Sequence, residues 1–164
     1  MIKNLKKDVS RRTVMFEELA RMLLRKKEKN NFIFSTRSFD SLNDLCSKYK
    51  LDISLLDIEI IDFLMNNLHS VDLVGFYLKD LDSRLIEFVK MFEVKTKNNN
   101  SESGFDLCFS SYDAYAFLKR KNVEVKLLSF VLFDDWNYSF NIYDINLDSF
   151  KKYTRYKLKD RIVD

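Results

Sequence analysis

The hydrophobic pattern changes near residue 69, and this change constrains the fold more than any other feature of the sequence. Before it, apolar residues recur at helical spacing, most clearly over residues 13–28. After it, apolar and aromatic segments alternate with turns rich in Asn, Asp and Ser. This order predicts an α/β or α+β fold in which helices flank a mixed β-sheet.

The individual elements follow from the same pattern. We expect helices at 13–28, 38–50, 53–67 and 111–121, and strands at 31–36, 71–78, 85–96, 125–133 and 138–145. Ser38 and Asp52 are expected to cap the second and third helices, and Ser110 with Asp113 has capping-box spacing for the fourth. The basic, aromatic tail, SFKKYTRYKLKDR, is expected to be either helical or frayed.

The rare residue types exclude several classes of protein. The chain has no proline and two glycines, Gly75 and Gly104. Dinucleotide-binding loops and P-loops need glycines at close, fixed spacing, so the chain contains neither. Cys46 and Cys108 lie in apolar surroundings without metal-ligand spacing, and we expect reduced, packed thiols. His69 is the single histidine and is interpreted as an ordinary surface residue.

Length and charge suit one globular domain. The 164 residues are enough for a single domain with one hydrophobic core. We divide this domain into the first helix (13–28), a helical insertion (30–69), a β-rich core (70–145) and a basic tail (146–164). No apolar run approaches the length of a membrane span, and the N-terminal segment lacks the apolar stretch of a signal peptide. We therefore expect a cytoplasmic protein without a membrane partner.

The segment FEVKTK carries the clearest chemical signal. On a strand, Glu93 and Lys95 point to one face and Val94 to the other. Asp72 lies near the start of the preceding strand, and antiparallel pairing would bring it close to Glu93. On the first helix, Glu17 borders the apolar stripe and is a third candidate acid. Carboxylates grouped in this way suit Mg²⁺ or Mn²⁺, with Lys95 beside the attacking water.

This arrangement resembles the PD-(D/E)XK nuclease superfamily, which includes archaeal Holliday-junction resolvases and Mrr-like restriction enzymes. TVMFEELARML is similar to the opening helix of that family, whose acid is often a further metal ligand. The resemblance covers residues 13–28 and about 70–145, although no proline precedes Asp72 and the segment 30–69 is longer and more helical. It implies a restriction-endonuclease-like fold, metal-dependent cleavage of DNA by Asp72, Glu93, Lys95 and Glu17, and, by analogy, a homodimer.

Basic residues indicate where nucleic acid would bind. In the tail they are interleaved with tyrosines, a pattern that suits phosphate contact and base stacking. The candidates are Arg11, Arg12, Lys97, Lys151, Lys152, Arg155 and Lys157. Two alternatives to a nuclease stay open, namely an inactive nucleic-acid-binding or assembly module on the same fold, and a helix-turn-helix regulator using residues 38–67. The acidic composition of 53–67 disfavours the regulator.

Overall fold

The computed structural model describes residues 2–28, 31–98, 106–107, 109–133, 137–145, 147 and 156–157, with side chains from residues 12–28, 31–98, 111–133, 137–145 and 147. Its elements are α1 (Ile2–Lys27), β1 (Asn31–Ser35), η1 (Thr36–Ser38), α2 (Leu42–Tyr49), α3 (Ile58–Asn67), η2 (Leu68–Ser70), β2 (Leu73–Leu78), β3 (Ile86–Asn98), β4 (Asp106–Leu107), α4 (Phe109–Arg120), β5 (Glu124–Leu132), β6 (Tyr138–Asp144) and β7 (Tyr156–Lys157).

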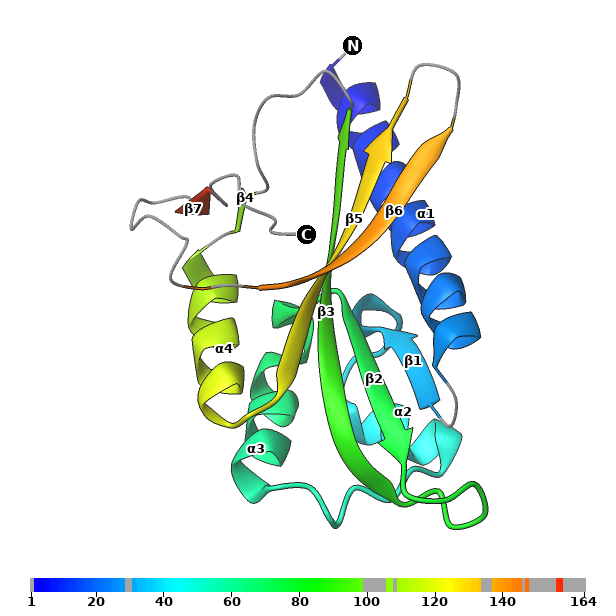
Figure 1. Ribbon diagram of the computed structural model, residues 1–164, viewed down its shortest axis with the longest axis vertical. Helices are drawn as coiled ribbons and strands as arrows, with labels where there is room; N and C mark the ends of the chain where they lie inside the picture. Colours follow the sequence, from blue (N-terminus) through cyan, green and yellow to red (C-terminus); the bar gives the residue numbers. More distant parts are fainter. Residues whose placement is uncertain are drawn as a thin grey trace.

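Five strands form one mixed sheet in the order β1-β2-β3-β5-β6 (Figure 1). β1, β2 and β3 pair antiparallel in succession, β3 and β5 pair parallel, and β6 returns antiparallel to β5. The parallel pair requires a crossover, which α4 supplies. The short strands β4 and β7 pair separately. The expected class, helices flanking a mixed sheet, is confirmed.

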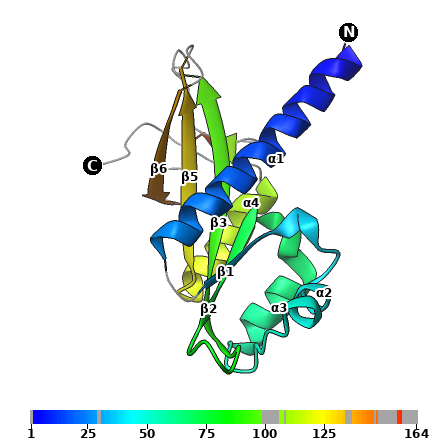
Figure 2. The same cartoon turned by 90° about the vertical axis from the view of Figure 1, so that its right-hand side faces the viewer.

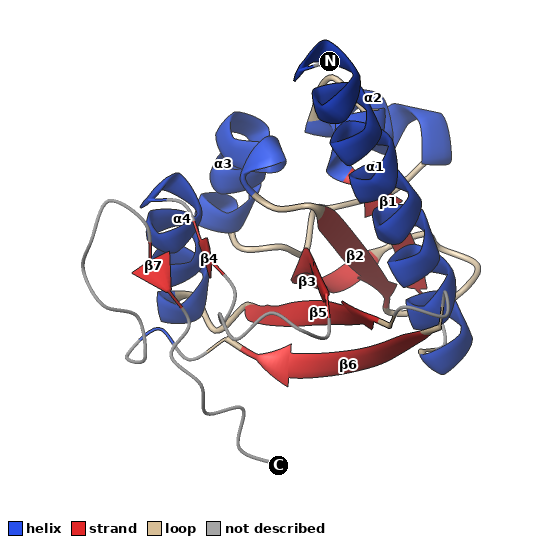
Figure 3. Ribbon diagram, turned by 90° about the horizontal axis from the view of Figure 1, so that it is seen from above, coloured by secondary structure: helices blue, strands red, loops and turns tan. Residues whose placement is uncertain are grey.

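The two faces of the sheet are covered by different helices. On one face, α1 buries Phe16, Ala20 and Leu24 against Phe92 and Phe130 of the sheet. On the other face, α2, α3 and α4 pack against the alternate side chains of β1, β2 and β3. Figure 3 shows α1 lying apart from α3 and α4, and Figure 2 shows α1 running across the strands of the sheet. The alternation along β3 therefore sends Glu93 and Lys95 to the α4 side, while Phe92 and Val94 face α1.

The helix starts differ from those expected. Ser38 ends the 3₁₀ turn η1, and α2 is capped by Ser41, whose hydroxyl accepts a hydrogen bond from the backbone N–H of Asp44. Asp52 pairs with Leu85 in an isolated β-bridge, and Asp57 caps α3 instead. Both predictions were wrong, because Ser38 is the last residue of η1 and the backbone of Asp52 pairs with that of Leu85; in each case a residue of the same type takes the cap position a few residues later.

Two further boundaries also moved. α1 begins at Ile2, eleven residues before the expected start at 13, so the basic N-terminal segment is helical. α4 begins at Phe109, which places Ser110 within the helix and corrects its assignment as the cap. None of these shifts changes the order of the elements along the chain.

The segment 30–69 is more than an insertion, because its first strand, β1, belongs to the main sheet. The remainder forms α2 and α3, which cover one sheet face through residues such as Leu45 and Phe63. Asp57, Glu59 and Asp62 are exposed on and beside α3, which argues against this helix entering a DNA groove. Among the described helices, none has the length and apolarity that crossing a membrane requires.

Candidate functional site

Asp72 and Glu93 face each other at the point where β2 begins. Leu73 of β2 pairs with Phe92 of β3 in the antiparallel register, so Asp72 and Glu93 are the next residues opposite each other beyond the start of β2. Asp72 Oδ2 accepts a hydrogen bond of 2.8 Å from the backbone N–H of Val94. This bond fixes the Asp72 carboxylate to the edge of β3, where β2 no longer covers it.

Glu93 is buried, with 5% of its surface exposed, and two groups hold its carboxylate. Lys95 Nζ lies 2.5 Å from Glu93 Oε1. On the opposite side, the hydroxyl of Tyr115 on α4 donates a hydrogen bond to Glu93 Oε2, and Ser111 in turn hydrogen-bonds with Tyr115. The partners of Glu93 thus come from its own strand and from the crossover helix.

Glu17 approaches Asp72 from α1 and is more deeply buried than its position in the sequence suggested, with 2% of its surface exposed. Ser35 Oγ donates a 3.3 Å hydrogen bond to Glu17 Oε2. Arg37 Nε lies 3.2 Å from Glu17 Oε1, yet within the described residues this oxygen receives no hydrogen bond. The neighbouring Glu18 is exposed and pairs with Arg21 on the solvent side of the helix.

Burial raises the pKa of both glutamates above the ordinary value of 4.5. For each, the charge of Asp72 raises the pKa further, whereas Arg37 and Ser35 act in the opposite direction on Glu17, and Lys95 and Tyr115 on Glu93. Because the folded state binds these protons more tightly than the unfolded chain, folding stability falls as the pH rises from 4.5 through the folded pKa. Ionised Glu17 and Glu93 therefore destabilise the fold unless a cation compensates them.

The carboxylates match a hard divalent cation in their chemistry. Mg²⁺ and Mn²⁺ prefer carboxylate oxygens, and Glu17 Oε1 is a buried oxygen without a donor. Within the described residues, however, no group of three His, Cys, Asp or Glu side chains is arranged to hold an ion. The side chains of Glu17, Asp72 and Glu93 thus lie near one another without standing at ligand distances.

Other residues singled out from the sequence lie elsewhere. Arg12 is exposed on α1, and Arg11 belongs to the same helix. Lys97 follows Lys95 by two residues on β3 and is half-buried. In the tail, Lys151, Lys152 and Arg155 lie outside the described residues, and Lys157 is placed only by its backbone in β7.

Among the described residues, neither Cys46 nor His69 has a contact with the carboxylate cluster. Cys46 is a half-buried free thiol, and burial raises its pKa to about 11. Cys108 lies outside the described residues, and His69 is exposed in η2. The carboxylate cluster is therefore the group of residues that carries the chemical argument.

Two contributors were missed from the sequence, Arg37 and Tyr115. Arg37 lies in η1, two residues after the end of β1, and belongs to no recognisable motif, so in the sequence it resembles any surface arginine. Tyr115 lies within a helix whose buried positions are otherwise apolar or small. A buried tyrosine hydroxyl requires a polar partner, so a tyrosine among buried helix positions predicts a polar contact. The sequence alone does not identify Glu93 as that partner.

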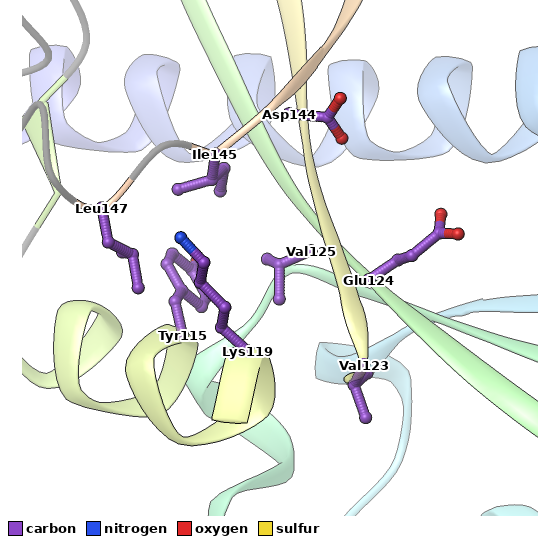
Figure 4. A pocket seen from close by; sticks show the side chains of 8 residues that line it. All are labelled: Tyr115, Lys119, Val123, Glu124, Val125, Asp144, Ile145 and Leu147. Atoms are coloured by element: carbon purple, nitrogen blue, oxygen red, sulfur yellow. The ribbon is translucent and has the colours of Figure 1, made fainter. Parts of the chain in front are cut away.

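A cavity of about 430 Å³ lies behind Tyr115, between α4 and the β5–β6 pair (Figure 4). Lys119, Ile145 and Leu147 gather there with the Tyr115 ring, while Glu124 and Asp144 point away from them (Figure 4). Those two acids instead pair with Lys126. Tyr115 thus connects this largely apolar cavity with Glu93, and the cavity holds no second group of converging carboxylates.

Comparison with known proteins adds no assignment. No protein-family model matches the chain, and no curated protein is significantly similar to it.

The Tyr115 hydroxyl can be tested by replacement with phenylalanine. Tyr115→Phe leaves buried Glu93 Oε2 without its donor, so we expect the free energy of unfolding to fall by about 1–3 kcal/mol at pH 8. The loss should shrink as the pH falls toward 4.5, because burial raises the pKa of Glu93 above that value and the buried carboxyl takes up its proton before an ordinary glutamate does. Urea unfolding at both pH values measures this, with Tyr138→Phe at an exposed tyrosine as the control. A loss that does not depend on pH would contradict the assigned contact.

Proposed function

We propose that the protein is a metal-dependent nuclease that hydrolyses phosphodiester bonds in DNA. The observation that carries this proposal is the approach of Glu17, Asp72 and Glu93, from a helix and two neighbouring strands, with Lys95 in contact with Glu93. Two buried carboxylates with raised pKa values beside a third are costly for a fold. Such a cost is typical of functional sites.

The order of elements supports the same proposal. An opening helix with an inward acid, Asp72 before one strand, Glu93 and Lys95 on the next, and then a helix and two strands is the arrangement on which the resemblance to the PD-(D/E)XK superfamily rests. The pairing of β2 with β3 and the crossover through α4 agree with it. The restriction-endonuclease-like fold is accordingly part of the proposal.

Each residue has a distinct role in the proposed reaction. Asp72, Glu93 and Glu17 would hold Mg²⁺ or Mn²⁺, which supplies a nucleophile at neutral pH and stabilises charge on the phosphate. Lys95 would donate hydrogen bonds to the attacking water and stabilise the negative charge that develops on its oxygen. Tyr115 would orient Glu93, since its hydroxyl fixes one carboxylate oxygen.

The competing proposal is a module that binds nucleic acid, or assembles with other proteins, without cleaving. It shares the fold and the basic residues and differs only in the chemical step. Incubation of the purified chain with plasmid, single-stranded and branched DNA, with Mg²⁺, with Mn²⁺ and with EDTA, separates the two. We expect cleavage of at least one substrate that depends on the divalent ion, and DNA binding without any such cleavage would favour the inactive module.

A further inference from the structure

Thr36, the residue before Arg37, is hydrogen-bonded to the backbone at Val71 and Asp72. Thr36, with 1% of its surface exposed, donates from Oγ1 to the carbonyl of Val71 at 2.6 Å. The backbone N–H of Thr36 donates to the carbonyl of Asp72 at 3.0 Å. Arg37 therefore starts from a fixed position next to the proposed site and does not reach it from a distant loop.

The guanidinium of Arg37 lies between two carboxylates and forms an ion pair with each, but within the described part of the chain it donates a hydrogen bond to neither. Nε is 3.2 Å from Glu17 Oε1 and Nη2 is 3.6 Å from Asp72 Oδ1, and among the described residues neither contact is a hydrogen bond. Arg21 differs, because its Nε and Nη2 both donate to Glu18 in a two-bond ion pair. The side chain of Arg37 is also 54% exposed, so solvent and a ligand can reach part of it.

We propose that Arg37 binds a backbone phosphate of the nucleic acid at this site. The inference rests on the proposed nuclease function and names a residue that contacts the substrate. A guanidinium carries five N–H donors in a planar arrangement that matches phosphate oxygens. An arginine that only neutralised Glu17 and Asp72 would be expected to donate to their oxygens, as Arg21 does to Glu18.

The positions of the two cations support this assignment. Lys95 contacts Glu93 on the α4 side of the sheet, and Arg37 contacts Glu17 and Asp72 at the end of β1. The carboxylates thus lie between two positive groups from different elements. The negatively charged carboxylates repel a phosphodiester, so an exposed cation is needed to attract it to this site. The side chain of Arg37 is more exposed than that of Lys95, at 54% against 29%.

The test is equilibrium binding of a fluorescent DNA oligonucleotide in EDTA, over a range of salt concentrations, so that no cleavage occurs. Arg37→Ala should weaken binding about 5- to 10-fold and reduce the slope of log affinity against log salt by about 1. Arg37→Lys should keep the wild-type salt dependence, and its affinity should lie between those of the wild type and Arg37→Ala. Lysine retains the positive charge but lacks the planar array of donors of the guanidinium. Arg37→Lys also keeps the test usable if the alanine variant does not fold. Arg120→Ala, at an exposed arginine ending α4, is the matched control and should bind like the wild type.

A second variant separates contact from simple charge balance. Adding Asp72→Asn to Arg37→Ala restores the local net charge, so recovery of wild-type affinity in the double variant would overturn the phosphate contact. Unchanged affinity and slope in Arg37→Ala, from a wild type that cleaves DNA, would also overturn it and leave the nuclease standing. A wild type that neither binds nor cleaves DNA would remove the proposed function and this inference together.

Discussion

Replacing Lys95 with alanine is expected to lower the rate of DNA hydrolysis by about two to four orders of magnitude at saturating substrate. Lys95 Nζ lies 2.5 Å from Glu93 Oε1, so the variant removes the cation from the proposed reaction centre but no metal ligand. The affinity for DNA should change little, because phosphate contacts elsewhere supply most of the binding. Single-turnover cleavage and equilibrium binding measured on the same oligonucleotide separate these two effects.

Two other variants show whether a slower rate in Lys95→Ala is specific to the proposed reaction centre. Lys79→Ala removes an exposed lysine just after the far end of β2, six residues of strand away from Asp72, and should cleave at the wild-type rate. Glu93→Gln keeps an oxygen for the Tyr115 hydroxyl to donate to but weakens a ligand, and should be as slow as Lys95→Ala. If Lys95→Ala cleaved within about threefold of the wild type, Lys95 would have no role in the chemical step.

The core of the site could be predicted because it depends on local periodicity. Alternation along β3 places Glu93 and Lys95 on one face, and an Asp at the start of the preceding strand meets Glu93 whenever the two strands pair as a hairpin. The helical stripe around Phe16 and Ala20 placed Glu17 at the edge of the buried surface. Its full burial depends on Ser35 and Arg37, which no periodicity along α1 reveals.

What could not be predicted depends on contacts between distant segments. Asp52 has the residue type of a helix cap, but its backbone pairs with Arg84 and Leu85, and Asp57, five residues later, caps α3 instead. Tyr115 meets Glu93 only because the crossover helix packs across β3. The sheet order itself, with β6 beyond β5, was likewise not determined by the order of elements along the chain.

Divalent cations are expected to stabilise the fold, and the effect should depend on pH in a defined direction. Binding to the native state alone contributes about 2.7 kcal/mol at a free ion concentration of 100 times Kd, which for a chain of this size raises Tm by roughly 5–10 °C. Protons compete for Glu17 and Glu93, whose pKa values are raised, so the shift should be larger at pH 8 than at pH 5. Thermal unfolding with Mg²⁺, Mn²⁺ or EDTA measures it, and Asp72→Asn should abolish it.

Glu17→Gln provides the sharpest form of this test, because it should raise the stability of the ion-free protein and reduce the further stabilisation that the ion gives. In EDTA at pH 8, the variant should be more stable than the wild type by about 1–2 kcal/mol, since it removes a buried charge whose Oε1 lacks a donor. With millimolar Mn²⁺ it should gain less stability than the wild type, because a ligand is weakened. Glu87→Gln, at an exposed position on the same strand as Glu93, should alter neither value. A Glu17→Gln protein that is less stable in EDTA yet keeps the full Mn²⁺ shift would show that Glu17 supports the fold and binds no ion.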